Sequence, residues 1–438
     1  MSVSRWWRLI PLIFVTYSLA YLDRANFGLA AAAGMAPELG LTPGKSALLG
    51  AVFFLGYVLF QVPGVLYAQR HGIRHLIGAS LLFWGLCSAL PGVVRDFRLL
   101  LIIRFGLGAA EAAVFPALLL YITRWFTRPE RARANALLIL GNPGTVLWMS
   151  VVSAYLISAL NWRWMFLLEG AATMLWAAVW WGLARERPSD AAWLPPEAAR
   201  ALEVELDREK SGRTAAPDPS SGPFPPAPKS AIARGAGSFG GAIRSPLVLL
   251  MAGQFFGWTM GVSGFVLWLP SILRSGTAMG IVQTGWCAAA PYVVSIVIMP
   301  LVSYWSDRVL RRKVFIWPFL LLGAGAFYGS YLAGAGHFWL SLGLLVVAGA
   351  AMYAPYGPFW ALVSELLSPS LAAPGTAIIN GGGAMGSFLG TYLVGFLNGA
   401  TGGPGASFLT MATGLALAAG LTLCIPSAAG SDANPSND

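Results

Sequence analysis

Long apolar stretches alternate with short polar or charged segments along almost the whole chain. A bilayer core of about 30 Å requires about 20 apolar residues per helix, and each apolar stretch reaches about that length. The pattern therefore predicts twelve transmembrane helices. They are expected at residues 8–32, 46–69, 75–94, 98–124, 134–160, 163–184, 245–273, 281–305, 314–334, 338–364, 371–398 and 404–426.

The composition excludes a soluble globular protein. Of the 438 residues, 57% are hydrophobic and only 11% are charged, whereas soluble domains carry about 25% charged residues. We therefore expect an all-α integral membrane protein. The three cysteines, Cys87, Cys287 and Cys424, lie far apart in apolar stretches, so they predict neither a disulfide framework nor a zinc site.

The net charge of +10 reflects orientation in the membrane rather than a nucleic-acid partner. Of the 28 Lys and Arg residues, 21 lie on the side of the predicted helices that holds the N-terminus and 5 on the opposite side. Positive residues concentrate in cytoplasmic loops of membrane proteins. Both termini are therefore expected in the cytoplasm.

One long hydrophilic stretch divides the predicted helices into two sets of six. Within it, Glu197–Lys210 predicts a short charged helix and Thr214–Lys229 a flexible linker rich in Pro and Ser. The expected domains are an N-terminal bundle, a cytoplasmic linker, a C-terminal bundle and a disordered cytoplasmic tail. Their limits are 1–184, 185–244, 245–426 and 427–438.

A short internal repeat supports this division. The segments Pro63–Arg74 and Pro300–Lys313 both contain proline, then tyrosine, then a basic turn, and each follows the second helix of its half. A shared need for a basic turn would produce part of this match by chance. Duplicated halves predict a binding site at their interface near the middle of the membrane.

Glycines gather in the predicted eleventh helix, at Gly381–Gly383, Gly386 and Gly390. A nucleotide-binding loop would need a following Lys-Ser or Lys-Thr pair, which this run lacks. Small residues let membrane helices approach closely, so the run predicts tight helix packing.

Four ionisable residues stand out inside predicted helices: Asp23 and Arg24 in the first, Arg104 and Glu111 in the fourth. Each costs about 2.5–3.5 kcal/mol at the middle of a membrane helix, so such residues commonly face a wet cavity. Neighbours on a helix point about 100° apart, so only one of Asp23 and Arg24 is expected to pair with the fourth helix. The four residues either hold the bundle together as ion pairs or serve as anion-binding arginines and proton-carrying acids. We favour the second interpretation.

Several runs of residues resemble one transporter family. Tyr21–Gly28 and Arg104–Pro116 are similar to the helix 1 and helix 4 signatures of the anion:cation symporter family of the major facilitator superfamily. Its members include sialin-like, sugar-acid, tartrate, phthalate and 4-hydroxyphenylacetate permeases. Further segments that resemble the family are Trp162–Gly170, Trp268–Pro270 and Gly357–Trp360. The resemblance implies the major facilitator fold, with two pseudo-symmetric six-helix bundles.

The resemblance also implies roles for particular residues. Arg24 matches the arginine that engages the substrate carboxylate, Asp23 and Glu111 match protonation sites, and Arg104 is coupled to them. Residues at positions that line the family's central cavity are Tyr21, Tyr57, Asn142, Trp360 and Asn380. As alternatives, Tyr57 and Trp360 could be packing aromatics, and the two asparagines could join helices by hydrogen bonds.

The basic turns are candidates for gating. The superfamily pattern usually places an acidic residue before its arginine, but Gln69 precedes Arg70 in the first half. Asp307 and Arg308 keep the acidic and basic pair in the second half. We therefore expect a weaker charge lock in the N-terminal half.

The predicted function is proton-coupled uptake of a small organic anion across a plasma membrane, expected to be a bacterial inner membrane. The chain is expected to be monomeric and to need no cofactor and no metal, because the proton gradient drives transport. Aromatic residues in the second half favour an aromatic or lightly hydroxylated carboxylate over a sugar acid. An exporter or anion exchanger is the alternative. A membrane-embedded enzyme is less favoured, because no His or Cys is spaced to act with Asp23 or Glu111. A receptor or channel is less favoured, because neither needs duplicated halves with a pair of residues that can carry protons.

Overall fold

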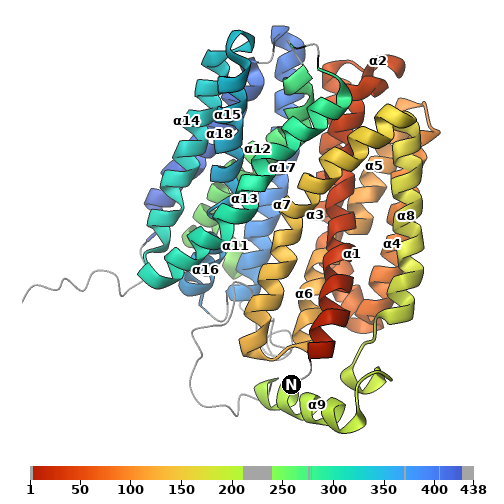
Figure 1. Ribbon diagram of the computed structural model, residues 1–438. Helices are drawn as coiled ribbons and strands as arrows, with labels where there is room; N and C mark the ends of the chain where they lie inside the picture. The colour runs from red at the N-terminus through yellow and green to blue at the C-terminus, as the bar shows by residue number, and fades with distance from the viewer. Residues whose placement is uncertain are drawn as a thin grey trace, which may run out of the picture. The chain divides into compact units, whose positions relative to one another are not determined.

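The structure is a computed structural model in which every regular element is a helix, within the residues that it describes (Figure 1). The described residues are 3–210, 239–274, 277, 279–368, 371–403 and 405–426. The predicted linker at Thr214–Lys229 and the predicted tail at 427–438 lie outside them.

The long helices follow the predicted spans closely. In the first half they are α1 (Val3–Ala30), α3 (Pro43–His71), α4 (Ile73–Ala89), α5 (Phe97–Glu111), α6 (Val114–Trp125), α7 (Arg128–Ala159) and α8 (Trp162–Leu183). In the second half they are α12 (Pro246–Arg274), α13 (Ile281–Val309), α14 (Trp317–Ala333), α15 (Phe338–Tyr353), α16 (Tyr356–Leu366), α17 (Ala372–Thr401) and α18 (Gly405–Cys424). Short elements between them include α2 (Ala36–Glu38), α9 (Pro196–Lys210) and α11 (Phe239–Ile243).

The fourth and tenth predicted helices are each broken in two, which the sequence analysis did not predict. Proline has no N–H to donate to the carbonyl four residues earlier, and its ring clashes with that carbonyl. The residues four before Pro116 and Pro358 are Ala112 and Ala354, and the helices stop at these two positions. The break thus recurs at the same place in both halves, which supports the duplicated architecture.

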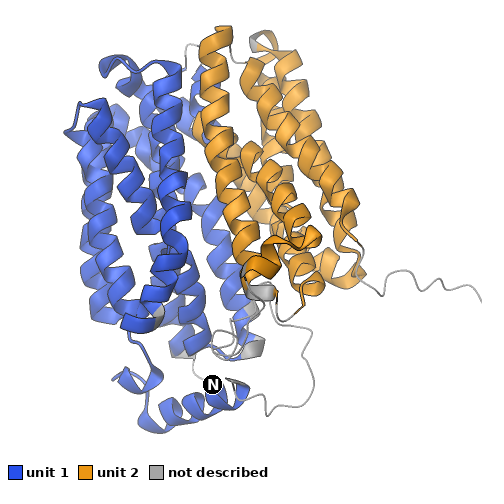
Figure 2. Cartoon of the chain, turned by 180° about the vertical axis from the view of Figure 1, so that it is seen from behind, with its two compact units in different colours: residues 1–222, 269–289 blue, residues 223–268, 290–438 orange. Residues whose placement is uncertain are grey.

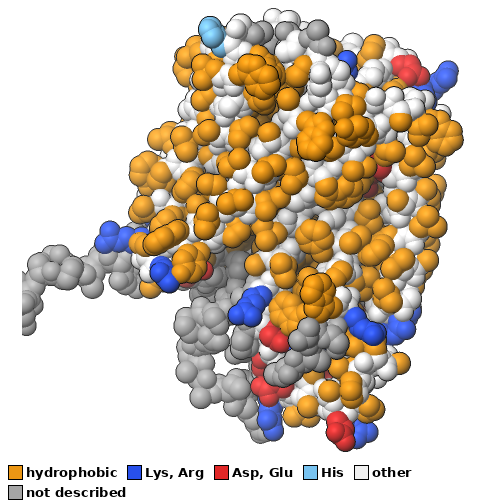
Figure 3. All heavy atoms as spheres, viewed as in Figure 1, with side chains coloured by type: hydrophobic (Ala, Val, Ile, Leu, Met, Phe, Trp, Pro, Cys, Tyr) orange, Lys and Arg blue, Asp and Glu red, His pale blue; other side chains and the backbone are white. Residues whose placement is uncertain are grey.

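Ten helical segments in the described part of the chain are long and apolar enough to cross a membrane. Two more helices, α1 and α17, have 28 and 30 residues but are less apolar, since α1 carries Asp23 and Arg24 and α17 is rich in glycine. Together they correspond to the twelve predicted spans. Large hydrophobic side chains are exposed on the helices, among them Leu175 and Ile102 (72% and 66%). Figure 3 shows such side chains over the helical faces in view, and in unit 1 Lys and Arg lie mainly toward the end that holds the N-terminus.

The chain folds into two compact units (Figure 2). Unit 1 comprises residues 1–222 and 269–289, and unit 2 comprises residues 223–268 and 290–438. In unit 1, α1 packs on α7, α3 on α5 and α4 on α8; in unit 2, α14 packs on α15 and α18. The domain limits expected from the sequence stay a prediction.

Glycines allow the closest helix contacts, as predicted for the eleventh helix. In unit 2, a Cβ atom on Gly386 or Gly390 of α17 would lie 2.1 Å from a main-chain oxygen of α12. In unit 1, a Cβ atom on Gly56 of α3 would lie 2.2 Å from Phe105 O of α5. A Cβ atom on Gly108 of α5 would lie 1.9 Å from Phe53 O of α3. Backbone touches backbone at these crossings.

Gly108→Ala is therefore expected to force α3 and α5 apart and to destabilise the protein by about 1–3 kcal/mol, the usual cost of overpacking. Thermal unfolding of purified protein in detergent measures this loss. Gly182→Ala is the matched control, because Gly182 of α8 is exposed and no heavy atom lies within 4 Å of its added Cβ. Equal unfolding temperatures for the two variants would contradict the close crossing.

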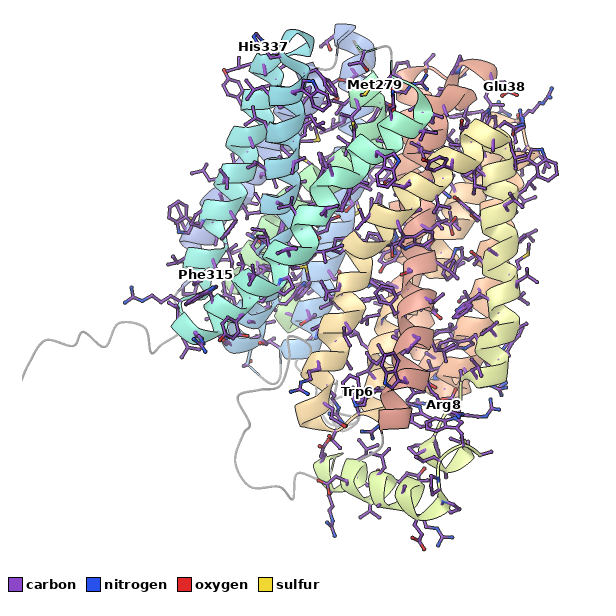
Figure 4. All side chains as sticks on the ribbon, viewed as in Figure 1. Trp6, Arg8, Glu38, Met279, Phe315 and His337 are labelled. Atoms are coloured by element: carbon purple, nitrogen blue, oxygen red, sulfur yellow. The ribbon has the colours of Figure 1, made fainter. Side chains whose placement is uncertain are left out.

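The predicted charged helix is present as α9, and it docks on the end of unit 1 that holds the N-terminus. Trp193 stacks on Trp125 with 5.8 Å between ring centroids, and Arg131 pairs with Glu209 of α9 at 3.0 Å. Trp6 and Arg8 lie beside this end, whereas Glu38 and Met279 lie at the opposite end of the unit (Figure 4). In unit 2, Phe315 and His337 mark the two ends.

At the opposite end of unit 1, Glu38 ties α2 to the start of α8. It accepts hydrogen bonds from Arg163 Nη2 at 2.8 Å and Trp162 Nε1 at 2.7 Å. These donors lower the pKa of Glu38. A lowered pKa means that the contact contributes stability at neutral pH and loses it as the pH falls through that pKa.

Candidate functional site

Arg24 of α1 and Glu111 of α5 form an ion pair inside unit 1. Arg24 Nε donates to Glu111 Oε2 at 3.1 Å, so Arg24 is the one of the two neighbours that pairs with the fourth predicted helix. The Arg24 side chain is 16% exposed, whereas that of Glu111 is 0% exposed. The second carboxylate oxygen of Glu111 accepts no hydrogen bond from the described residues. The arginine is thus the accessible partner and the acid the enclosed one.

Aromatic rings surround the Arg24 guanidinium. Its central carbon lies 4.9 Å from the ring centroids of Tyr21 and Tyr57 and 5.3 Å from that of Phe53. Asn142 Nδ2 of α7 donates to the Tyr21 hydroxyl at 2.5 Å. Four residues expected at the site therefore lie together: Arg24, Tyr21, Tyr57 and Asn142. Such cation–π contacts contribute about 0.5–2 kcal/mol each.

Asp23 faces a different direction from Arg24, as the helical geometry requires. Its carboxylate accepts hydrogen bonds from Trp84 Nε1 and Ser88 Oγ of α4, and a longer one of 3.4 Å from Asn26 Nδ2. Asp23 is buried. It is held by neutral donors rather than by a contact with the arginine beside it.

Arg104 of α5 contacts main-chain oxygens rather than a carboxylate. Its Nε donates to Leu49 O and its Nη1 to Asp23 O, both at 3.2 Å. The guanidinium carbon lies 4.9 Å from the ring centroid of Phe27 and 5.6 Å from that of Phe53. Its expected coupling to the two acids remains a prediction.

The sequence analysis missed a third buried acid, Glu169 of α8. Its carboxylate accepts from Asn26 Nδ2 at 2.8 Å and from Ser153 Oγ of α7 at 2.5 Å. The signal was available, because an acid within the predicted helix 163–184 meets the same criterion that selected Asp23 and Glu111. Asn26, Trp84, Ser88 and Ser153 carried no comparable signal, since polar uncharged residues are common in membrane helices.

In unit 2, Trp360 belongs to an aromatic cluster. It packs edge-on against Phe255 and Phe359, which stack on each other with 5.1 Å between ring centroids. This favours the packing alternative for Trp360, which is 6% exposed. Asn380 is half-buried in α17. The cavity-lining roles of both residues stay predictions.

The candidate gating residues lie at helix ends. Arg70 is exposed near the end of α3. In unit 2, Asp307 pairs with Arg312, which also binds Glu365 at 2.9 Å, while Arg308 lies over the Tyr304 ring at 4.6 Å. The charge network of this turn therefore centres on Arg312, a residue that the sequence analysis did not select.

Within the described part of the chain, no group of three His, Cys, Asp or Glu side chains could hold a metal ion. The chemistry of the unit 1 site consists of a partly exposed arginine, buried carboxyls and neutral hydrogen-bond donors. Such a set can bind an anion and can hold protons.

Comparisons with known proteins find similar chains among transporters. The profile of the Major Facilitator Superfamily matches residues 13–282 and 272–436. A protein of Agrobacterium vitis named a putative tartrate transporter is 30% identical over 424 residues, which cover 95% of this chain and 89% of that protein. A quinolone resistance transporter of Acinetobacter baumannii is 27% identical over 408 residues, which cover 90% of this chain and 88% of that one.

The fold also matches a solved transporter. The crystal structure of a bacterial homolog of the human lysosomal transporter Spinster, in an inward-facing and occupied conformation, superimposes with a TM-score of 0.73. It covers 97% of both chains at 16% sequence identity. An identity this low shows the shared fold alone.

Proposed function

We propose that this chain, which belongs to the Major Facilitator Superfamily, takes up a small organic anion together with protons by alternating access. It is a multi-pass membrane transporter and not an enzyme. The proposed substrate is a carboxylate such as an aromatic acid, a sugar acid or a hydroxy or dicarboxylic acid. The proton gradient supplies the energy, and no cofactor takes part.

The Arg24–Glu111 pair is the observation that carries this proposal. A guanidinium binds a carboxylate through charge-assisted hydrogen bonds, and Arg24 is partly exposed while Glu111 is enclosed behind it. A substrate carboxylate that engages Arg24 therefore competes with Glu111. Once Glu111 loses this partner, its buried charge is costly, and a proton removes that cost. Binding of the anion and binding of the proton then favour each other.

The similar proteins bear on the substrate and on the direction of transport. The putative tartrate transporter of Agrobacterium vitis is named for a hydroxy dicarboxylic acid, which supports a carboxylate substrate. The quinolone resistance transporter is named for resistance to a drug, which favours export as the second candidate function.

Uptake by the purified protein in liposomes tests the proposal. With the outside acidified, the vesicles are expected to accumulate at least one of L-tartrate, D-galactonate and 4-hydroxyphenylacetate, and a protonophore should abolish the accumulation. Expulsion of the acid under the same gradient would establish the exporter instead. A failure of all three acids to bind or to move would contradict the carboxylate assignment.

We further propose a bacterial inner membrane location, a monomer, and termini and α9 in the cytoplasm. Arg200 is exposed on α9, so Arg200→Cys, in a background without Cys87, Cys287 and Cys424, should react with a membrane-impermeant maleimide in inverted vesicles. In intact cells the cysteine at position 200 should stay unlabelled. Labelling of intact cells would contradict this orientation, while labelling of both preparations after permeabilisation controls for access.

A further inference from the structure

Two buried acids of unit 1 share one amide group. Asn26 Nδ2 donates to Glu169 Oε2 at 2.8 Å and to Asp23 Oδ1 at 3.4 Å. Asn26 is 0% exposed, and its Oδ1 accepts no hydrogen bond from the described residues. Asn26 therefore bridges the two carboxyl groups, and its amide oxygen Oδ1 can still accept a hydrogen bond.

The two acids differ in their surroundings. Asp23 receives three hydrogen bonds from Trp84, Ser88 and Asn26. Glu169 receives two, from Asn26 and Ser153, and within the described residues it pairs with no Lys or Arg. A buried carboxylate without a cation is costly, whereas the protonated carboxyl carries no charge.

The charged and titratable neighbours of Glu169 on each packed helix are few. On α1 they are Asp23 and Arg24, and Arg24 is engaged with Glu111. On α4, Cys87 is buried and adjoins Ser88 in the chain. On α7 the contact is Ser153, and on α8 itself Arg163 lies at the helix start and binds Glu38. Asp23 is thus the acid that faces Glu169.

The donors identify the ligand as a proton rather than a metal cation. The carboxylate oxygens of Asp23 and Glu169 already accept hydrogen bonds through their lone pairs. The donors are Trp84, Ser88, Ser153 and Asn26. A bridging amide suits a proton, because a half turn of the Asn side chain replaces its donor by its acceptor. The oxygen of Asn26 can then accept from a carboxyl that has gained a proton.

We propose that Glu169 is a proton-binding residue of the transport cycle, connected to Asp23 through the Asn26 amide. This inference rests on the proposed proton-coupled transport. Glu169 does not touch the Arg24 site in unit 1 and acts at a distance from it. Each turnover would then move one proton more than Asp23 and Glu111 alone account for.

The equilibrium accumulation ratio tests the inference, because each coupled proton multiplies it about tenfold per pH unit of imposed gradient. Proteoliposomes are loaded with the acid that the parent transports, and the membrane potential is held at zero with potassium and valinomycin. Glu169→Gln keeps the shape of the side chain but cannot lose or gain a proton. Its amide oxygen can accept from Asn26, and its NH2 group can donate to the Ser153 hydroxyl once that hydroxyl turns to accept. The variant is expected to exchange substrate as the parent does and to reach a ratio about tenfold lower per pH unit.

Two further variants separate the proton from a structural role. Ser153→Ala keeps the acid but removes a donor to its ionised form, so its accumulation ratio should equal the parent's while half-maximal uptake moves to higher pH. Thr173→Val is the matched control, since this buried hydroxyl one turn along α8 donates to Glu169 O and not to the carboxylate. It should leave both measurements unchanged.

The outcomes are distinct. An unchanged ratio in Glu169→Gln overturns the inference and leaves the proposed function standing. Loss of exchange in both Glu169→Gln and Ser153→Ala, with Thr173→Val intact, makes Glu169 a purely structural residue and also overturns it. Accumulation driven by a sodium gradient in place of the pH gradient overturns the proton assignment. A parent protein that fails to accumulate any acid under a pH gradient contradicts the proposed function itself.

Discussion

Arg24→Lys is expected to weaken substrate binding by roughly a hundredfold or more, although the positive charge is kept. A guanidinium can hold a carboxylate with two parallel hydrogen bonds, and each charge-assisted bond contributes about 1.5–3 kcal/mol. A lysine ammonium lacks the planar fork and stacks less well on the rings of Tyr21, Tyr57 and Phe53. Titration calorimetry of the purified variant with a transported acid measures the loss.

The control for this substitution is Arg8→Lys. The Arg8 guanidinium also lies over an aromatic ring, that of Trp193 at 5.1 Å, but at the end of unit 1 that holds the N-terminus. It should bind substrate as the parent does. If the affinity of the Arg24→Lys variant for substrate lies within about threefold of the parent's, Arg24 is not the substrate ligand. Such a loss of binding free energy is well under the roughly 1.4 kcal/mol that a tenfold change represents.

Glu111→Gln is expected to abolish accumulation driven by a pH gradient while leaving substrate-for-substrate exchange intact. The amide imitates the permanently protonated acid, and exchange never requires the deprotonated carrier to return empty. Net uptake does require that return, so it should stop. Counterflow and gradient-driven uptake, measured in the same proteoliposomes, separate the two steps.

Glu205→Gln removes a carboxylate from the exposed face of α9 and should change neither step. A Glu111→Gln variant that still concentrates substrate like the parent would exclude Glu111 as the coupling residue. Coupling would then fall to Asp23, to Glu169, or to no proton at all. Loss of exchange together with accumulation would instead indicate that Glu111 positions Arg24 for binding.

The helices could be predicted because a membrane demands long apolar stretches, and the charged turns between them are unmistakable. The breaks at Ala112 and Ala354 could not. Pro63 and Pro143 also lie inside long helices, yet α3 and α7 continue through them. Membrane helices tolerate proline when neighbours satisfy the freed carbonyl. Proline alone therefore does not decide where a helix stops.

The site could be predicted in part, because ionisable residues in apolar helices are rare enough to stand out. That criterion selected Asp23, Arg24, Arg104 and Glu111. It left open which neighbour pairs with Glu111, because that choice depends on α4 lying where Trp84 and Ser88 can bind Asp23. The resemblance implied that Arg104 is coupled to the acids, but its contacts could not be predicted, since its partners are main-chain oxygens, which every residue carries.

The helix break after Glu111 also determines the electrostatic field at that side chain. Glu111 is the last residue of α5, and Pro116 has no N–H to donate to the carbonyl of Ala112, the residue directly after Glu111. A carbonyl without its helical donor adds partial negative charge beside the buried Glu111 carboxyl group, whereas Arg24 adds positive charge. At the matching end of α15 the last residue is Tyr353, which carries a phenol in place of a carboxyl group. The two halves share the break, but the first places a carboxyl group there and the second a phenol, so the helices of the duplicated fold match while the side chains at the break do not.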